Sequence, residues 1–242
     1  MRTVVVCPGR GSYSANSLGY LKNVVSERLD SADEYRSHFN RPTVREMDSA
    51  ERFQSKWHIA GENASILTAG ISAADFDQIK EEWDIVAICG NSMGWYTALG
   101  LSGALPYRES LRLIETMGQY QQGNIIGGQI LYPLIDEEWK QAPANAELVE
   151  ELVTTIPDLH WSIKLGGQAV LGGSKAALDA AIKTLPKTTI GKVTFPRKLP
   201  LHSAFHTPLM HATHQQAVGD LIDLNIASPN IPLIDGRGHT WL

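Results

Sequence analysis

The stretch "DIVAICGNSMGWYTALGL", residues 84–101, decides which fold class the chain adopts. Its first part is a short apolar run, which is typical of a strand buried on both faces of a parallel sheet. The run ends in "GNSMG", residues 90–94, and passes directly into a helical pattern. A buried strand that leads straight into a helix predicts an α/β fold.

The segments before and after this stretch continue the alternation of strands and helices. Residues 3–7 form a β-branched run that Pro8-Gly9 stops, and they predict a first buried strand. Residues 43–83 are mostly helical in pattern, and further helices are predicted from Met93 to about Leu101 and over Arg108–Gln121. Strand, crossover, strand and helix in this order predict a parallel sheet.

The composition changes at Gly123, which predicts a small inserted subdomain at 124–198. Glycines bound a predicted strand in residues 123–135, residues 136–155 are helical in pattern, and residues 160–173 predict a hairpin that turns at Gly166-Gly167. Ser174 is the predicted N-cap of the next helix, and residues 189–199 read as a further strand. The order β-α-β-β-α-β is ferredoxin-like. The core is then expected to consist of residues 1–123 and 199–242.

Composition and charge exclude several classes of protein. The 242-residue chain has a net charge of −5, which argues against nucleic acid as the main partner. No apolar run approaches the roughly 20 residues that span a bilayer, and the apolar part of the N-terminus is too short for a signal peptide. The two cysteines, Cys7 and Cys89, follow apolar runs and are predicted to be buried free thiols of a reducing compartment. We therefore expect a cytoplasmic protein without a membrane partner.

The serine in "GNSMG" matches the nucleophile-elbow pattern Gly-x-Ser-x-Gly between a strand and a helix. This turn exposes a hydroxyl at the helix N-terminus, where the N–H of Met93 faces a developing oxyanion. The alternative is an ordinary strand–helix turn capped by Ser92. A serine nucleophile also needs a base, and the segment 201–211, which holds His202, His206 and His211, is favoured for it.

Two further features of the sequence concern ligands. The loop "CPGRGS", residues 7–12, follows the first strand, and its glycines allow the backbone to approach a ligand closely. The alternative is a plain Gly-Pro turn. His202 and His206 have no third ligand at a suitable spacing, so no metal site is predicted.

Together these motifs resemble the malonyl-CoA:acyl carrier protein transacylases and the acyltransferase domains of polyketide synthases. The first loop of that family reads P-G-Q-G-S, and residues 8–12 here read "PGRGS". The family's elbow reads G-H-S-L-G-E, and residues 90–95 here read "GNSMGW". Its histidine block is similar to "SAFHTPLM" at 203–210, and the segments 164–173 and 231–238 are similar to family strands. The order and spacing match over nearly the whole chain.

The resemblance implies a ping-pong acyl transfer on a hydrolase-like α/β acyltransferase core with a parallel sheet. Ser92 is expected to be the acylated nucleophile, His206 the general base and then the acid, and the backbone N–H groups of Arg10 and Met93 the oxyanion hole. The acyl group passes from coenzyme A to the serine, and then to the phosphopantetheine thiol of an acyl carrier protein. Acyl-CoA is expected as a donor substrate, with no permanently bound cofactor. Asn91 and Phe205 are expected to line the substrate site.

The chain departs from the family where the malonyl carboxylate is bound. The family carries E-x-R-G on a helix, whereas residues 115–118 here read "ETMG". Met117 cannot balance a carboxylate, which favours an uncharged acyl group and leaves a thioester hydrolase as an alternative. In a second explanation Arg10, which replaces the family's glutamine, supplies a relocated guanidinium for the malonyl carboxylate or the phosphates of coenzyme A. A third possibility for Arg10 is a side chain that points into solvent. Trp95, in place of glutamate, is expected to be a packing residue.

The family continues beyond the point that corresponds to "DGRGHTWL", residues 235–242. Either the sequence is a fragment or the final helices are absent. In the second case Asp235 is a weak candidate for orienting the catalytic histidine, and the uncovered apolar face favours a homodimer or a synthase partner. A simple serine esterase and a non-catalytic relative that only binds a carrier protein are the remaining alternatives.

Overall fold

The computed structural model describes residues 1–123 and 125–242, which form two compact units. The first unit comprises Met1–Gln122 together with Gly219–Leu242, and the second comprises Gly123–Val218. Residue 124, at which the inserted subdomain is predicted to begin, lies outside the described residues.

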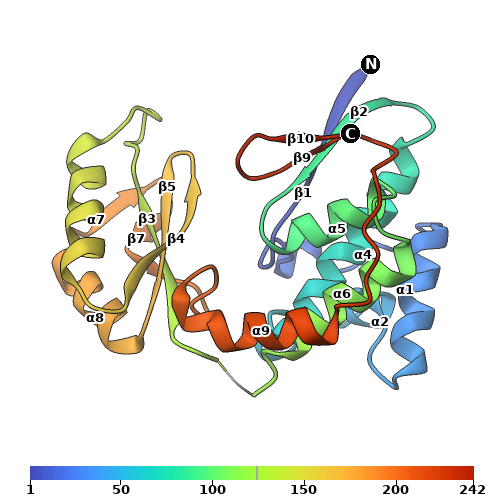
Figure 1. Ribbon diagram of the computed structural model, residues 1–242, viewed down its shortest axis with the longest axis horizontal. Coiled ribbons are helices and arrows are strands. Elements are labelled where there is room, and N and C mark those ends of the chain that lie inside the picture. The colour runs from blue at the N-terminus through green and yellow to red at the C-terminus, as the bar shows by residue number, and fades with distance from the viewer. Residues whose placement is uncertain (124) are drawn as a thin grey trace. The chain divides into compact units, whose positions relative to one another are not determined.

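The sheet of the first unit has the parallel core that the sequence predicts (Figure 1). Strand β1 (Arg2–Cys7) pairs in parallel with β2 (Asp84–Gly90), and β2 pairs in parallel with β9 (Leu233–Ile234). A short strand β10 (Thr240–Trp241) returns antiparallel on β9. Because β1 and β2 run in the same direction, their carboxyl ends meet at one edge of the sheet.

Helices account for most of the rest of the first unit. The predicted helix after the elbow is α5 (Met93–Leu101), and the next one is α6 (Tyr107–Gln119). The helical pattern of residues 43–83 is confirmed, although it is divided among three helices. These and the remaining helices are a 3-10 turn η1 (Ala15–Ser17), α1 (Glu27–His38), α2 (Val44–Asp48), α3 (Ser55–His58), α4 (Gly61–Ile79) and α9 (His211–Asp220), which crosses the boundary between the units. In the described part of the chain, no helix is both long enough and apolar enough to cross a membrane.

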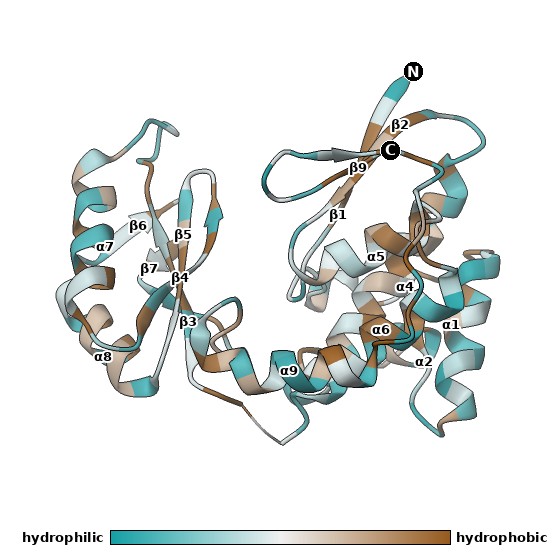
Figure 2. Cartoon of the chain, viewed as in Figure 1, coloured by the Kyte–Doolittle hydropathy of each residue, from teal (hydrophilic) through white to brown (hydrophobic). Residues whose placement is uncertain are grey.

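An apolar cluster holds α4, α5 and α6 on the sheet. Ile88 of β2 and Ala98 of α5 are fully buried in it, and Phe76 of α4 and Leu113 of α6 are also buried there. Figure 2 shows α5 as a largely apolar helix, as expected for one packed against the strands. Burial of each large apolar side chain stabilises the fold by about 1.5–3 kcal/mol, so this cluster fixes where α5 begins relative to β1 and β2.

A buried ion pair connects α1 to α6. Arg36 is 1% exposed and donates from Nη1 to Oε1 of Glu115 at 2.7 Å, while Arg41 donates to the other carboxylate oxygen at 2.5 Å. Arg36 also donates to Oδ1 of Asn63 on α4 at 2.7 Å. The glutamate of the "ETMG" stretch is therefore a structural residue that ties α6 to α1, and Arg36 extends the network to α4.

The second unit is a four-stranded antiparallel sheet with helices. The order β4-β5-β3-β8 and the connectivity are consistent with the predicted ferredoxin-like pattern. Its elements are β3 (Gly128–Pro133), α7 (Pro143–Thr155), β4 (Leu159–Leu165), β5 (Gln168–Gly173), α8 (Lys175–Thr184), β6 (Thr188–Ile190), β7 (Val193–Phe195), β8 (Arg197–Lys198) and a 3-10 turn η2 (Pro208–Met210). Gly166, at φ +55°, turns the predicted hairpin between β4 and β5, and Ser174 caps α8 by accepting from the N–H of Ala177.

Three details of the second unit differ from the sequence-based expectation. Residues 189–199 are not one strand, because Gly191 at φ +59° turns the chain into the β6–β7 hairpin before β8. Helix α7 begins at Pro143, because a bridge between Ile135 and Gln141 holds residues 136–142 in a turn. The unit also extends to Val218, beyond the predicted limit of 198. This extension follows from the histidine segment, whose Ala204 N–H bonds to the carbonyl of Ile126 at 2.7 Å.

Substituting Glu115 by alanine is expected to destabilise the protein by about 3–5 kcal/mol, because it leaves the buried Arg36 without its carboxylate. The free energy of unfolding, measured by urea denaturation, checks this. Glu109→Ala on the same helix is the control, since it removes only a half-exposed pair with Arg112 and should cost at most about 1 kcal/mol. Equal losses for both variants would contradict the structural role of the buried pair.

Candidate active site

Ser92 lies at the turn between β2 and α5 in a rare backbone conformation. Its φ of 54° and ψ of −117° are outside the regions that residues with side chains normally occupy. Such strain costs about 1–3 kcal/mol and persists only where the surrounding structure imposes it. Since α5 begins at Met93, the strained residue stands directly before the N-terminus of a helix.

The glycines on either side of Ser92 are required by close backbone contacts. A β-carbon at Gly90 would lie 2.2 Å from the carbonyl oxygen of Gly94. A β-carbon at Gly94 would lie 2.2 Å from the carbonyl oxygen of Cys7 and 2.7 Å from that of Pro8. All these distances are shorter than atomic contact allows, so Gly90 follows from the tightness of the turn itself and Gly94 from how closely α5 approaches the end of β1.

The glycine-rich loop after β1 lies beside the elbow. Cys7 is in register with Gly90, and the N–H of Asn91 donates to the carbonyl of Cys7 at 3.2 Å. A β-carbon at Gly9 would lie 3.0 Å from the carbonyl oxygen of Asn91. The hydroxyl of Ser12 closes the loop by donating to the carbonyl of Gly9 at 2.6 Å. The carboxyl ends of two parallel strands therefore bring the loop and the elbow together.

The two predicted oxyanion donors belong to these two neighbouring segments. Met93 is the first residue of α5, so its N–H has no carbonyl partner within the helix and lies at the positive end of the helix dipole. The following N–H groups are engaged, since Gly94 donates to Asn91 and Trp95 donates to Ser92, both at 2.9 Å. Arg10 supplies the other predicted N–H from the adjacent loop. An arrangement of this type can stabilise negative charge on a carbonyl oxygen.

The side chain of Arg10 is directed into the first unit rather than into solvent. Its guanidinium donates from Nη1 to Oε1 of Gln121, just after α6. The same nitrogen would lie 2.8 Å from a β-carbon at Gly61, the first residue of α4. Burial lowers the pKa of Arg10 to about 10, and the nearby carboxylate of Glu62 counteracts this. The solvent-exposed alternative for this residue is therefore wrong.

Met117 lies on the same helix that Arg10 reaches. Its side chain and that of Trp95 pack against the apolar cluster around Ile88, so the expected packing role of Trp95 is confirmed. Gln121 follows Met117 by about one helical turn. The guanidinium of Arg10 therefore lies at the end of the helix that carries Met117.

The histidine segment belongs to the second unit. His206 has φ +58°, which is uncommon for a residue with a side chain, and burial lowers its pKa. The neighbouring Thr207 donates from its hydroxyl to the carbonyl of Ala204 at 2.6 Å. His202, the other candidate histidine of this segment, has Nδ1 2.8 Å from Oε1 of Gln129.

Other residues singled out in the sequence have local partners. His58 is buried, with Nδ1 near Gln54 and Nε2 3.0 Å from the carbonyl of Met47. Asp235 accepts from Arg237 and from the N–H of His239 within the β9–β10 hairpin, and the Arg237 side chain lowers its pKa. In residues 1–123 and 125–242, no group of three His, Cys, Asp or Glu side chains could hold a metal ion.

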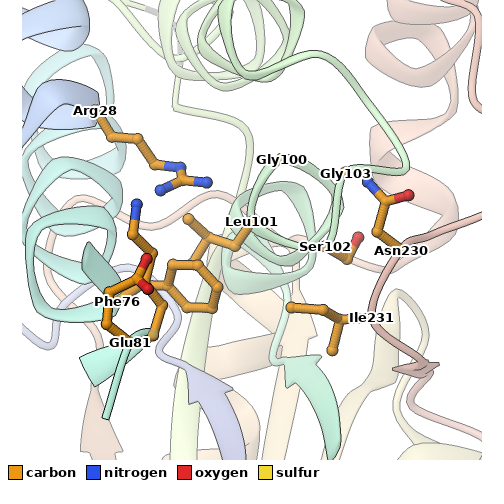
Figure 3. A pocket seen from close by; sticks show the side chains of 10 residues that line it. Arg28, Phe76, Glu81, Gly100, Leu101, Ser102, Gly103, Asn230 and Ile231 are labelled. Carbon is orange, nitrogen blue, oxygen red and sulfur yellow. The ribbon is translucent and has the colours of Figure 1, made fainter. Parts of the chain in front are cut away.

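The first unit also contains a pocket of about 290 Å³, to which the predicted site residues contribute no wall (Figure 3). Figure 3 shows Arg28 on one side of it and Asn230 and Ile231 on the other. The basic side chains at this pocket already have a partner, because Arg28 and Lys80 both pair with Asp77. We assign it no ligand.

Each unit thus brings together part of the predicted site. The first unit places Ser92, Asn91, Met93 and the Arg10 loop at one edge of its sheet, with Met117 in the adjoining cluster. The second unit holds the predicted base His206 and the adjacent predicted substrate-site residue Phe205.

Comparison with known proteins gives the site its context. No protein-family model matches the chain. The malonyl CoA-acyl carrier protein transacylase of Haemophilus influenzae is 26% identical over 237 residues, which are 96% of this chain and 72% of that protein. The chain is similar in sequence to malonyl CoA-acyl carrier protein transacylases. The resemblance seen in the motifs is therefore confirmed.

Solved transacylase structures share the fold. The malonyl-CoA:ACP transacylase of Synechocystis sp. PCC 6803 superimposes with a TM-score of 0.78 at 16% identity, over 97% of this chain and 74% of that one. A malonyl-transacylase of a type II polyketide synthase, solved in complex with its acyl-carrier protein, gives a TM-score of 0.74 at 18% identity, over 96% and 73% of the two chains. The predicted α/β transacylase fold is confirmed.

Alanine at Gly94 is expected to destabilise the protein by about 1–3 kcal/mol, because its β-carbon would overlap the carbonyl of Cys7. Thermal unfolding measures the loss. Gly219→Ala is the matched control, since nothing lies within 4 Å of its added β-carbon. The same change there should be neutral or slightly stabilising. Equal melting temperatures for the two variants would show that α5 does not approach β1 this closely.

Proposed function

We propose that the protein is an acyltransferase that moves an acyl group from acyl-CoA, through an ester on Ser92, to the phosphopantetheine thiol of an acyl carrier protein. The observation that carries this proposal is the strained Ser92 at the N-terminus of α5, beside the glycine-rich loop. The homologues are named for the malonyl form of this reaction, and one solved neighbour is in complex with an acyl-carrier protein.

The proposed reaction has two balanced halves. In the first, His206 takes the proton of the Ser92 hydroxyl as the oxygen attacks the thioester carbon, and the N–H groups of Met93 and Arg10 hold the resulting oxyanion. The carbon–sulfur bond then breaks, and coenzyme A leaves as a thiol with the proton from His206. In the second, the carrier thiol gives its proton to His206 and attacks the ester carbon. The ester carbon–oxygen bond then breaks, and the Ser92 oxygen leaves as a hydroxyl with the proton from His206.

We further propose that the acyl group is uncharged. Met117 contributes a thioether and packs with apolar side chains, so it offers no charge to a carboxylate. Arg10 does carry a charge, but Glu62 opposes it and Gln121 already accepts from it. An acyl carboxylate placed there would have to compete with Glu62 for the guanidinium. Acetyl and longer unsubstituted chains meet no such competition.

The choice of donor tests both parts of the proposal. Acetyl-CoA and butyryl-CoA should acylate the wild-type protein faster than malonyl-CoA, and the holo form of a carrier protein should release the acyl group. Ser92→Ala should abolish both steps. Rapid consumption of the thioester with no carrier present would instead indicate a hydrolase. Absence of any reaction with every donor would overturn the proposed function.

Met117→Arg is expected to raise the rate constant for malonyl transfer relative to acetyl transfer by about 10–100-fold, because a hydrogen bond to a charged group contributes about 1.5–3 kcal/mol. Met117→Leu is the control, since it keeps the apolar pocket and should leave the ratio unchanged. Preference of the wild type for malonyl-CoA that is lost in Arg10→Gln would contradict the uncharged acyl group. That outcome would assign the carboxylate to Arg10.

The pH dependence of the first half-reaction is expected to reflect His206. The histidine accepts a proton only when it is neutral, and burial lowers its pKa from the usual 6.5. The neutral form therefore persists to a lower pH than in an exposed histidine, and kcat/KM for acyl-CoA should fall only below a midpoint under pH 6.5. A midpoint at or above that value would contradict a buried histidine base.

A further inference from the structure

We propose that Gln129 and Ser162 form a hydrogen-bond relay that positions His206 through the carbonyl group of Phe205. This inference rests on the proposed function, because it assumes that His206 is the general base. Gln129 and Ser162 are positioning residues in this account, and neither is expected to touch the substrate.

The relay runs through three side chains and ends on the backbone next to the histidine. Nδ1 of His202 lies 2.8 Å from Oε1 of Gln129. Nε2 of Gln129 donates to the hydroxyl oxygen of Ser162 at 2.6 Å. The hydroxyl of Ser162 donates to the carbonyl oxygen of Phe205 at 2.8 Å. Strands β3 and β4 therefore reach the histidine segment through one connected set of polar groups.

The donor and acceptor capacities fix the direction of this relay. The carbonyl of Phe205 can only accept, so the Ser162 hydroxyl proton is committed to it. The serine oxygen must then accept from the amide nitrogen of Gln129, which leaves the amide oxygen to accept from Nδ1–H of His202. With the amide reversed, the serine would face two acceptors with a single proton. All the bonds therefore point toward the Phe205 carbonyl, an order in which each bond polarises the next.

The carbonyl that receives the relay controls the conformation of the histidine. The peptide group between Phe205 and His206 includes the carbonyl oxygen of the first and the nitrogen of the second, and rotation of this plane changes φ of His206. That angle is +58°, a value that a side chain disfavours. A hydrogen bond that holds the plane therefore stabilises the histidine in a conformation that a side chain disfavours.

The surrounding segment is anchored independently of the relay. Ala204 donates to the carbonyl of Ile126, and Ile126 donates to Oγ of Ser203 at 3.1 Å. Ser203 and Ala204 are fully buried. These bonds hold the chain before Phe205, so removal of the relay should change the peptide plane at His206 without releasing the whole segment.

A buried glutamine on β3 also requires a reason beyond packing. Gln129 is 3% exposed, and the next residue, Ile130, lies in the apolar cluster of the second unit with Tyr132. Side chains alternate along a strand, so Gln129 points away from that cluster, toward the face where Ser162 lies. An amide buried without partners destabilises a protein, and an apolar residue would fill the same space. The amide is explained by the bonds that it makes.

Single-turnover acylation by acetyl-CoA, followed by quenched mass measurement, tests the relay. Ser162→Ala and Gln129→Met should each lower the rate constant for acylation of Ser92 by about 10-fold, since small displacements of a catalytic group cost this much or more. The KM for acetyl-CoA should not change, and the double variant should lose no more than either single one. Ser162→Thr keeps the hydroxyl and should retain the wild-type rate constant.

The control is Tyr132→Phe, which removes a hydrogen bond from the same strand to the carbonyl of Pro186, away from His206. Its rate constant should equal that of the wild type. The relay is refuted if Ser162→Ala and Gln129→Met match this control, or if they lower only the amplitude of acylation, which reports the folded fraction. Failure of the proposed function itself is distinct, because the wild type would then form no acyl-enzyme and His206→Ala would change nothing.

Discussion

The whole site depends on how closely helix α5 approaches the end of β1. The carbonyl oxygen of Cys7 would lie 2.2 Å from any β-carbon at position 94, so only glycine allows the helix to begin there. This contact aligns the first N–H of α5 with the loop that follows β1. It also forces the chain through the strained conformation of Ser92. The cost of that strain is offset by the apolar cluster that packs α4, α5 and α6 on the sheet.

One difference from the family that the sequence resembles concerns the position of the positive charge near helix α6. Where the resembling family carries an arginine on α6, this chain has Met117 packed among apolar side chains. A guanidinium does reach the end of α6, but it comes from Arg10, which donates to Gln121 and is stabilised by the nearby charge of Glu62. In the proposed function, Met117 therefore offers no charge to an acyl carboxylate, which is the basis for proposing an uncharged acyl group. The backbone N–H groups proposed for the oxyanion hole do not depend on these side chains.

The elements that the sequence predicts well are those determined by local patterns. Helix α5 has the predicted bounds, and β1 and β2 differ from prediction by a single residue, because apolar runs bounded by glycine and proline define them. The structure of residues 189–199 is harder to predict, since the β-branched run does not indicate that Gly191 forms the turn of a hairpin. The inward direction of Arg10 depends on Gln121, which is distant in sequence. Gln129 and Ser162 gave no signal either, because their importance arises from contacts with residues far along the chain.

The most direct test of this account is the location of the acyl group in the trapped intermediate. The protein would be mixed with acetyl-CoA, quenched in acid within seconds and digested, and the mass of each peptide measured with and without holo carrier protein. The account predicts one acetyl group, on the peptide that contains Ser92, which disappears when the carrier thiol is present. An acetyl group found only on another peptide, such as that of the Cys7 thiol, or no acetylated peptide at all, would contradict it.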